Sequence, residues 1–116
     1  MTEPVAYKIL TGDQWAAFER DGVFRGAPVD LADGYIHLST ASQLAETAAR
    51  HFAGQEGLVV AAVDIAALGA AVRWEVSRGG ALFPHLYAPL GEAHLLWAEP
   101  MPLVDGRHQP PRRLPA

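Results

Sequence analysis

Three short segments of the chain carry side chains that could take part in catalysis or ligand binding. The first is the strand-like run YIHLS. Side chains along a β-strand point alternately to its two faces, so Ile36 and Leu38 would enter the core. Tyr35, His37 and Ser39 would then share the opposite face, where an imidazole and a hydroxyl can bind a ligand. A plainer interpretation is that His37 only hydrogen-bonds a neighbouring residue on a half-exposed strand.

Thr40 directly follows this run, and Gln43 stands three residues later, which is the spacing of a helix capping box. The free N–H groups at a helix start attract anions, so Thr40 would lie where a phosphate or another anion binds. Plain capping explains Thr40 and Gln43 equally well, and both interpretations stay open at this point.

The second segment is RWEVSRGG, residues 73–80. Glu75 would act as a general base or hold a ribose hydroxyl, and Arg78, which precedes two glycines, would reach a phosphate. The alternative is that Arg73 and Glu75 form an ion pair on one strand face, which would contribute little to stability.

The third segment is FPHLY, in which Pro84 restricts Phe83 to an extended backbone. Phe83, His85 and Tyr87 would then share one side and form an aromatic and imidazole face suited to stacking on a planar ring. The alternative is that Phe83 and Tyr87 belong to the core and that His85 lies at its polar rim.

His37, His85 and Glu75 together would supply two imidazoles and a carboxylate, a ligand set found in catalytic zinc sites. No two histidines have the close spacing of a metal motif, so we expect no metal. The residues predicted to be catalytic are Glu75 and His85. The residues predicted to bind a cofactor or ligand are His37, Ser39, Thr40, Arg78 and Tyr87.

Composition narrows the class of protein. The chain has 116 residues, of which 50% are hydrophobic, and it has no cysteine and a formal net charge of −4. Disulfides and thiol nucleophiles are therefore excluded, and a cytoplasmic location is expected. The negative charge argues against nucleic acid as a partner, and no apolar run is long enough for a membrane partner. A small molecule or nucleotide is the expected partner. No sequence pattern indicates the oligomeric state.

Hydrophobic patterns predict an α+β fold with a mostly antiparallel sheet, because helices come early and strands late. We expect one globular domain over residues 1–104 and a mobile tail rich in proline and arginine over residues 105–116. The predicted strands are residues 5–10, 35–39, 58–65, 72–77 and 92–101. The predicted helices are residues 13–22 and 41–54, and residues 24–34 are predicted to be a loop.

Several motifs in order, over about residues 5–100, resemble the bacterial family called domain of unknown function 952. They are YKILTGDQW, DGYIHLSTASQ, the RWE triplet and LFPHLY. The family in turn resembles the ADP-ribosyltransferase fold, with two small packed antiparallel sheets, flanking helices and a cleft that holds NAD. The resemblance implies that His37 replaces the His of the His-Gly-Ser/Thr motif, which contacts the adenosine ribose. Leu38 stands where those enzymes often have glycine.

The function expected from this resemblance is binding of an NAD-like nucleotide, with an ADP-ribosyl- or NAD-processing transferase as its catalytic form. His37 would orient the ribose, an aromatic side chain of FPHLY would stack on the base, and Glu75 would stabilise a positively charged ribose. Two alternatives remain: a binding or interaction module without catalysis, whose cleft bulky apolar side chains would fill, and a metal-dependent hydrolase.

Overall fold

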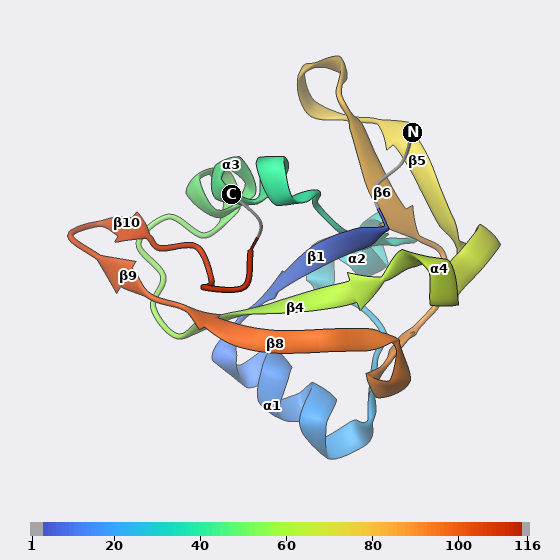
Figure 1. The fold of residues 1–116 in the computed structure, drawn as a ribbon, viewed down its shortest axis with the longest axis horizontal. Helices are drawn as coiled ribbons and strands as arrows, with labels where there is room; N and C mark the ends of the chain where they lie inside the picture. The colour runs from blue at the N-terminus through green and yellow to red at the C-terminus, as the bar shows by residue number, and fades with distance from the viewer. Residues whose placement is uncertain (1–3, 115–116) are drawn as a thin grey trace.

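The computed structural model of the protein describes residues 4–114, apart from the side chain of Arg78. Its first sheet is antiparallel and has the order β1-β4-β8 (Figure 1), formed by β1 (Val5–Leu10), β4 (Leu58–Asp64) and β8 (Leu95–Met101). The central position of β4 follows from its continuous apolar run, because only a strand covered on both faces can bury consecutive apolar side chains. Residues 60–63 are fully buried, which confirms the predicted central strand.

The second sheet is also antiparallel and has the order β3-β6-β5. It contains β3 (Ile36–His37), β6 (Leu82–Leu86) and β5 (Val72–Val76), and the β5–β6 hairpin rises at one end of the first sheet (Figure 1). A bridge between Tyr7 and Ser39, with N···O distances of 2.8 and 2.9 Å, joins the two sheets through β1. The residues just after β3 are therefore held at the junction of the two sheets.

Two smaller antiparallel pairs complete the strands: β2 (Val23–Phe24) with β7 (Leu90–Gly91), and β9 (Leu103–Val104) with β10 (Arg107–His108). Short helical segments link the strands, namely α4 (Ile65–Leu68) and four 3₁₀ turns at Ala41–Gln43, Gly69–Ala71, Arg78–Gly80 and Glu92–His94. All these pairings are antiparallel, which confirms the α+β class with small antiparallel sheets. No helix within residues 4–114 has the length and apolarity to cross a membrane.

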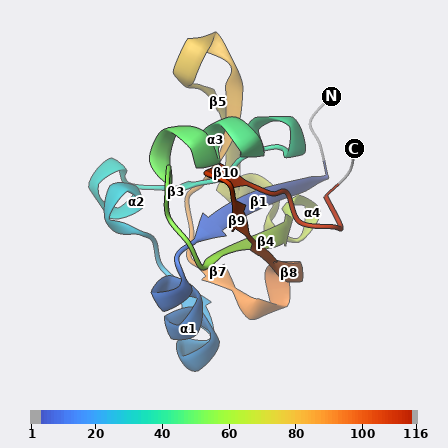
Figure 2. The ribbon, with the colours of Figure 1, turned by 90° about the vertical axis from the view of Figure 1, so that its left-hand side faces the viewer.

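Helix α1 (Gly12–Asp21) begins with the capping box predicted from the sequence. Thr11 Oγ1 accepts the Gln14 N–H at 3.1 Å, and Gln14 Oε1 accepts the Thr11 N–H at 2.9 Å. Gly22 ends the helix at φ +74°, a left-handed conformation that favours glycine. The helix lies on the opposite side of the first sheet from α3 (Figure 2) and buries Phe18.

We expect Thr11→Ala to lower the free energy of unfolding by about 1 kcal/mol, because it leaves an N–H at the helix start without its acceptor. Urea unfolding followed by circular dichroism measures this change. Glu19→Ala is the control, because Glu19 is exposed on the same helix and lies away from its start. Equal stability of wild type and Thr11→Ala would show that the cap contributes nothing.

Helix α2 (Pro28–Asp33) occupies the segment that was predicted to be a loop, so that prediction was wrong. The same residues are helix start and stop signals: Pro28 occupies the first turn, and Gly34 ends the helix at φ +88°. Asp30 accepts the Ala27 N–H at 2.7 Å, which satisfies one of the free donors at the helix start. Turn-forming residues at this spacing therefore bound one short helix.

Helix α3 (Leu44–His51) follows the 3₁₀ turn at Ala41–Gln43, and together they confirm the helix predicted there, with an earlier end. Leu44 and Ala48 are buried, and Phe52 packs partly buried beside them, as the helical spacing predicted. They form a core under α3, on one face of the first sheet. The larger core lies between the other face, α1 and the second sheet, and includes Ile36 and Leu38 as predicted.

The described part of the predicted tail contacts the domain. Leu114 packs against the core under α3, Arg113 pairs with Glu99 at 3.0 Å, and His108 Nε2 lies 2.9 Å from the Gln55 carbonyl. The β9–β10 pair was not predicted from the sequence. The mobility predicted for this segment stays a prediction.

Candidate functional site

The face of the second sheet that points away from the larger core gathers the three chemical segments of the sequence. In the strand register His37 lies opposite His85, His85 opposite Arg73, and Phe83 opposite Glu75. Alternation then places every second residue of β3, β6 and β5 on this one face. We call it the polar face; its residues are Tyr35, His37, Ser39, Arg73, Glu75, Ser77, Phe83, His85 and Tyr87.

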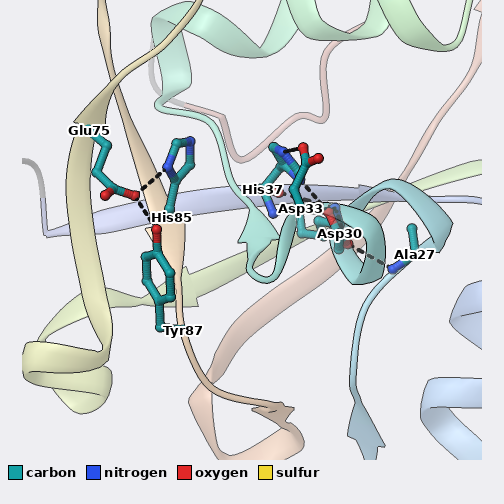
Figure 3. A network of polar contacts seen from close by, with 8 residues as sticks. Ala27, Asp30, Asp33, His37, Glu75, His85 and Tyr87 are labelled. Carbon is teal, nitrogen blue, oxygen red and sulfur yellow. Dashed lines mark hydrogen bonds and ion pairs between the residues drawn. The ribbon is translucent and has the colours of Figure 1, made fainter.

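His37 is held by two carboxylates of α2 (Figure 3). Its Nδ1 lies 2.6 Å from Asp30 Oδ1, and its Nε2 lies 2.9 Å from Asp33 Oδ2. A carboxylate only accepts hydrogen bonds, so an imidazolium can donate to both while a neutral imidazole can donate to one. The side chain of His37 keeps 31% of its surface exposed, so it remains accessible to a ligand.

Asp30 is the centre of a buried network. Its carboxylate binds Lys8 Nζ at 2.9 Å and the backbone N–H groups of Ala27 and His37 at 2.7 and 3.0 Å. Burial by itself would raise the pKa of Asp30, but the hydrogen bond from His37, the charge of Lys8 and the two N–H donors outweigh it and lower the pKa to about 2. Burial lowers the pKa of Lys8, and the charge of Asp30 opposes that effect. This network ties α2 and β1 to His37.

His85 is held by a different carboxylate. Its Nδ1 lies 2.8 Å from Glu75 Oε1, and the Tyr87 hydroxyl donates to the same oxygen at 2.6 Å (Figure 3). The Arg73 guanidinium lies 4.6 Å from the centre of the Tyr87 ring. The hydrogen bonds from Tyr87 and His85 lower the pKa of Glu75, because they stabilise its ionised form.

Removing one of these hydrogen bonds gives a direct test of their effect on Glu75. We expect Tyr87→Phe to raise the pKa of Glu75 toward its ordinary value, because the largest lowering contribution is lost. The carboxyl carbon signal of Glu75 in an NMR pH titration reports this pKa. Tyr7→Phe, on β1, serves as the control with the same chemical change, and an unchanged titration of Glu75 in Tyr87→Phe would contradict the contact.

The Tyr35 ring contacts the imidazole rings of both His37 and His85. Its ring stacks on His85 with centres 4.1 Å apart and planes at 26°, and its centre lies 4.6 Å from that of His37. The Tyr87 ring lies 5.2 Å from it on the same face. Tyr35 therefore restricts the orientation of both imidazole rings from one side. This agrees with the strand alternation, which predicted that Tyr35 and His37 share one face.

A pocket of about 490 Å³ opens beside the polar face. From the polar face it is lined by His37, Ser39, Ser77, Phe83 and His85. Asp33 of α2 and Thr47, His51 and Phe52 from α3 and its end add to the wall. The pocket thus combines imidazoles, hydroxyls and aromatic rings, which is the kind of lining that binds small molecules.

The other predicted site residues lie elsewhere. Glu75 and Tyr87 stand behind His85 and are not part of the pocket wall among the described residues. Thr40 is buried, and its N–H donates to Gln43 Oε1 at 3.0 Å, so the structure shows the capping role left open above. Tyr87 is 39% exposed and His85 is buried, the reverse of the alternative that placed Tyr87 in the core and His85 at its rim. The side chain of Arg78 lies outside the described part of the structure.

Within residues 4–114 no group of three or more His, Asp or Glu side chains has an arrangement that could hold a metal ion. The set of His37, His85 and Glu75 considered from the sequence is divided by geometry, since Glu75 binds His85 Nδ1 while His37 is held by α2.

The family model described as "Protein of unknown function (DUF952)" matches residues 9–98. The chain belongs to the DUF952 family. This confirms the family resemblance inferred from the motifs around His37 and His85. No curated protein matches the chain.

Solved structures of another protein, CC0527 from Caulobacter crescentus, share the fold. Its crystal structure is 48% identical and covers 90% of this chain and 93% of its own, with a TM-score of 0.87. Its solution NMR structure is 45% identical and covers 91% of each chain, with a TM-score of 0.81. The DUF952 fold described above is therefore found in a relative solved by two experimental methods.

Neither carboxylate that holds His37 was predicted from the sequence. Asp30 and Asp33 lay in the segment predicted to be a loop. A loop has no regular side-chain periodicity, so that prediction did not place these carboxylates near His37. Two signals were present: Pro28 with Asp30 is a helix start, and Asp33 precedes His37 by four residues. Lys8 was assigned only to a strand, since its pairing depends on tertiary structure.

Proposed function

We propose that this DUF952 protein binds an NAD-like nucleotide in the pocket beside the polar face. The observation that carries the proposal is the pocket itself, whose volume of about 490 Å³ lies within the range of about 300–1,000 Å³ of small-molecule sites. Its wall offers aromatic surface from Phe52 and Phe83 for a base, together with imidazoles and hydroxyls for a ribose.

The individual roles follow the resemblance to ADP-ribosyltransferases. His37 orients the ribose from the pocket wall by holding the Asp33 carboxylate beside it, and Ser39 contributes its hydroxyl on the same wall. Arg78 follows the pocket residue Ser77 and is our candidate for the phosphate contact. Thr40 supports this region by ordering the start of the helix, and Tyr87 acts through Glu75 rather than by stacking on the ligand.

A transferase reaction is the second form of this proposal. Glu75 points to His85 and Tyr87 in the described structure, so in an enzyme it would act on the nucleotide through His85. The same contacts favour a binding module without turnover, because they use the carboxylate within the protein. The open pocket supports either form over a module whose cleft is filled by apolar side chains.

Isothermal titration calorimetry with NAD⁺, ADP-ribose and nicotinamide tests the binding. We expect saturable binding of NAD⁺ and ADP-ribose and a dissociation constant at least tenfold higher in His37→Gln, a loss of about 1.4 kcal/mol. His108→Gln is the matched control, because His108 lies on β10 outside the pocket wall. Nicotinamide release, followed by chromatography, separates a transferase from a binding module. Absence of binding by all three compounds would overturn the proposal.

A further inference from the structure

The residues behind the pocket wall set which of its atoms donate and which accept hydrogen bonds. His85 Nδ1 lies 2.8 Å from Glu75 Oε1, and an ionised carboxylate can only accept. Nδ1 must therefore carry the hydrogen, which leaves Nε2 of the neutral ring as an acceptor. Among residues 4–114 no side chain or backbone group is hydrogen-bonded to Nε2, and this edge of the ring points away from Glu75 (Figure 3).

Ser39 Oγ is also an acceptor, and two hydrogen bonds that involve the Thr47 hydroxyl show why. Thr47 Oγ1 donates its one hydrogen to the Gln43 carbonyl at 3.1 Å, a group that can only accept. The contact of 2.9 Å between Ser39 Oγ and Thr47 Oγ1 must then use the hydrogen of Ser39. Ser39 lines the pocket and its Oγ keeps lone pairs that can accept, so it is a second acceptor on the wall.

Asp33 supplies a third acceptor. Its carboxylate lines the pocket, keeps 46% of its side-chain surface exposed, and contacts His37 Nε2 at 2.9 Å through Oδ2. Lys8 is the one lysine or arginine among the described lining residues, and its Nζ is bonded to Asp30 and to the His37 carbonyl. This part of the wall therefore offers an anionic group no lysine or arginine without a partner among the described residues, and its acceptors favour a ligand that brings donors.

We propose that His85 Nε2, Ser39 Oγ and the Asp33 carboxylate form an acceptor wall that recognises the neighbouring hydroxyl groups of a sugar. Glu75 is the positioning residue, because it fixes the tautomer that makes Nε2 an acceptor. The Tyr87 hydroxyl holds Glu75 in place, and the Arg73 guanidinium in turn lies over the Tyr87 ring. The identity of the sugar as a ribose rests on the proposed function, whereas the hydrogen-bond directions of the wall do not.

The tautomer of His85 tests the acceptor wall in the protein without any ligand. Long-range ¹H–¹⁵N NMR spectra of the full chain distinguish the two tautomers, and His85→Gln assigns the signals. We expect the Nδ1–H form in wild type and in Glu19→Ala, an exposed control on α1, and a shift toward the Nε2–H form in Glu75→Ala. An Nε2–H tautomer in wild type, or no change in Glu75→Ala, would overturn the proposal.

A pair of nucleosides tests recognition of the hydroxyls. We expect adenosine to bind at least tenfold more tightly than 2′,3′-dideoxyadenosine, because the latter leaves two wall acceptors unpaired. Equal binding of the two nucleosides would refute hydroxyl recognition. If neither nucleoside binds and His85 has the Nδ1–H tautomer, the nucleotide function is rejected. The assignment of His85 Nε2 as an acceptor is then still supported.

Discussion

Asp30→Asn is expected to lower the free energy of unfolding by about 3–5 kcal/mol, because it leaves the buried ammonium of Lys8 without its counter-charge. The Asp30 and Lys8 side chains are 1% and 7% exposed, so water cannot replace the lost partner. Asn has one oxygen where Asp has two, so the four donors around Asp30 would compete for that single oxygen. Urea unfolding at pH 7 measures the change.

Asp33→Asn is the matched control, since Asp33 lies on the same helix and also contacts His37 but is 46% exposed. We expect it to change stability by less than about 1 kcal/mol. If Asp30→Asn were as mild as Asp33→Asn, the buried network would not be a main support of the fold around His37.

The same carboxylate predicts a dependence of stability on pH. Its pKa is about 2 in the folded protein, below the ordinary value of 3.8, so its contribution is complete above about pH 4 and is lost as the pH falls toward 2. In Asp30→Asn this part of the acid dependence should disappear. Unfolding midpoints of both proteins across this range give the test, and parallel acid curves would assign the loss to other groups.

Leu86→Ala should destabilise the protein by about 2–5 kcal/mol, because it opens a cavity in the larger core. Leu86 is 0% exposed and lies on β6 between Ile36 of β3 and Val72 of β5. It is adjacent to His85, so the same cavity should also loosen the strand that carries the imidazole.

Leu82→Ala makes the same chemical change at the other end of β6, where the side chain is 51% exposed. We expect it to cost less than about 1 kcal/mol, because little apolar surface is lost from the core. Thermal unfolding compares the two variants, and similar midpoints would contradict the assignment of Leu86 as the core residue beneath the site.

Much of the fold was predictable because local patterns and burial agree. The apolar run at residues 58–65 can only be satisfied by a central strand, and Thr11 with Gln14 places the start of α1. Helix α2 was missed because its Gly, Pro and Asp also fit a loop, and its six residues are too few for a helical hydrophobic pattern. The β9–β10 pair was missed because its strands have two residues each.

The candidate site was predictable where strand alternation applies. Alternation placed His37, Glu75 and His85 on sheet faces, but which faces coincide depends on the register between strands far apart in sequence. The pairing of His85 with Glu75 and of His37 with Asp30 is a product of that register and of α2. For the same reason Glu75 could be identified as a polar candidate but not as the residue behind His85.

The central claim is that the pocket beside the polar face is a ligand site, and NMR mapping with NAD⁺ tests it most directly. In ¹H–¹⁵N correlation spectra of the ¹⁵N-labelled chain, saturating NAD⁺ should shift the amide signals of His37, Ser39, Thr47 and His85, while those of α1 residues 16–21 stay in place. Spectra without shifts at millimolar NAD⁺, or shifts confined to residues outside the pocket wall, would contradict the account.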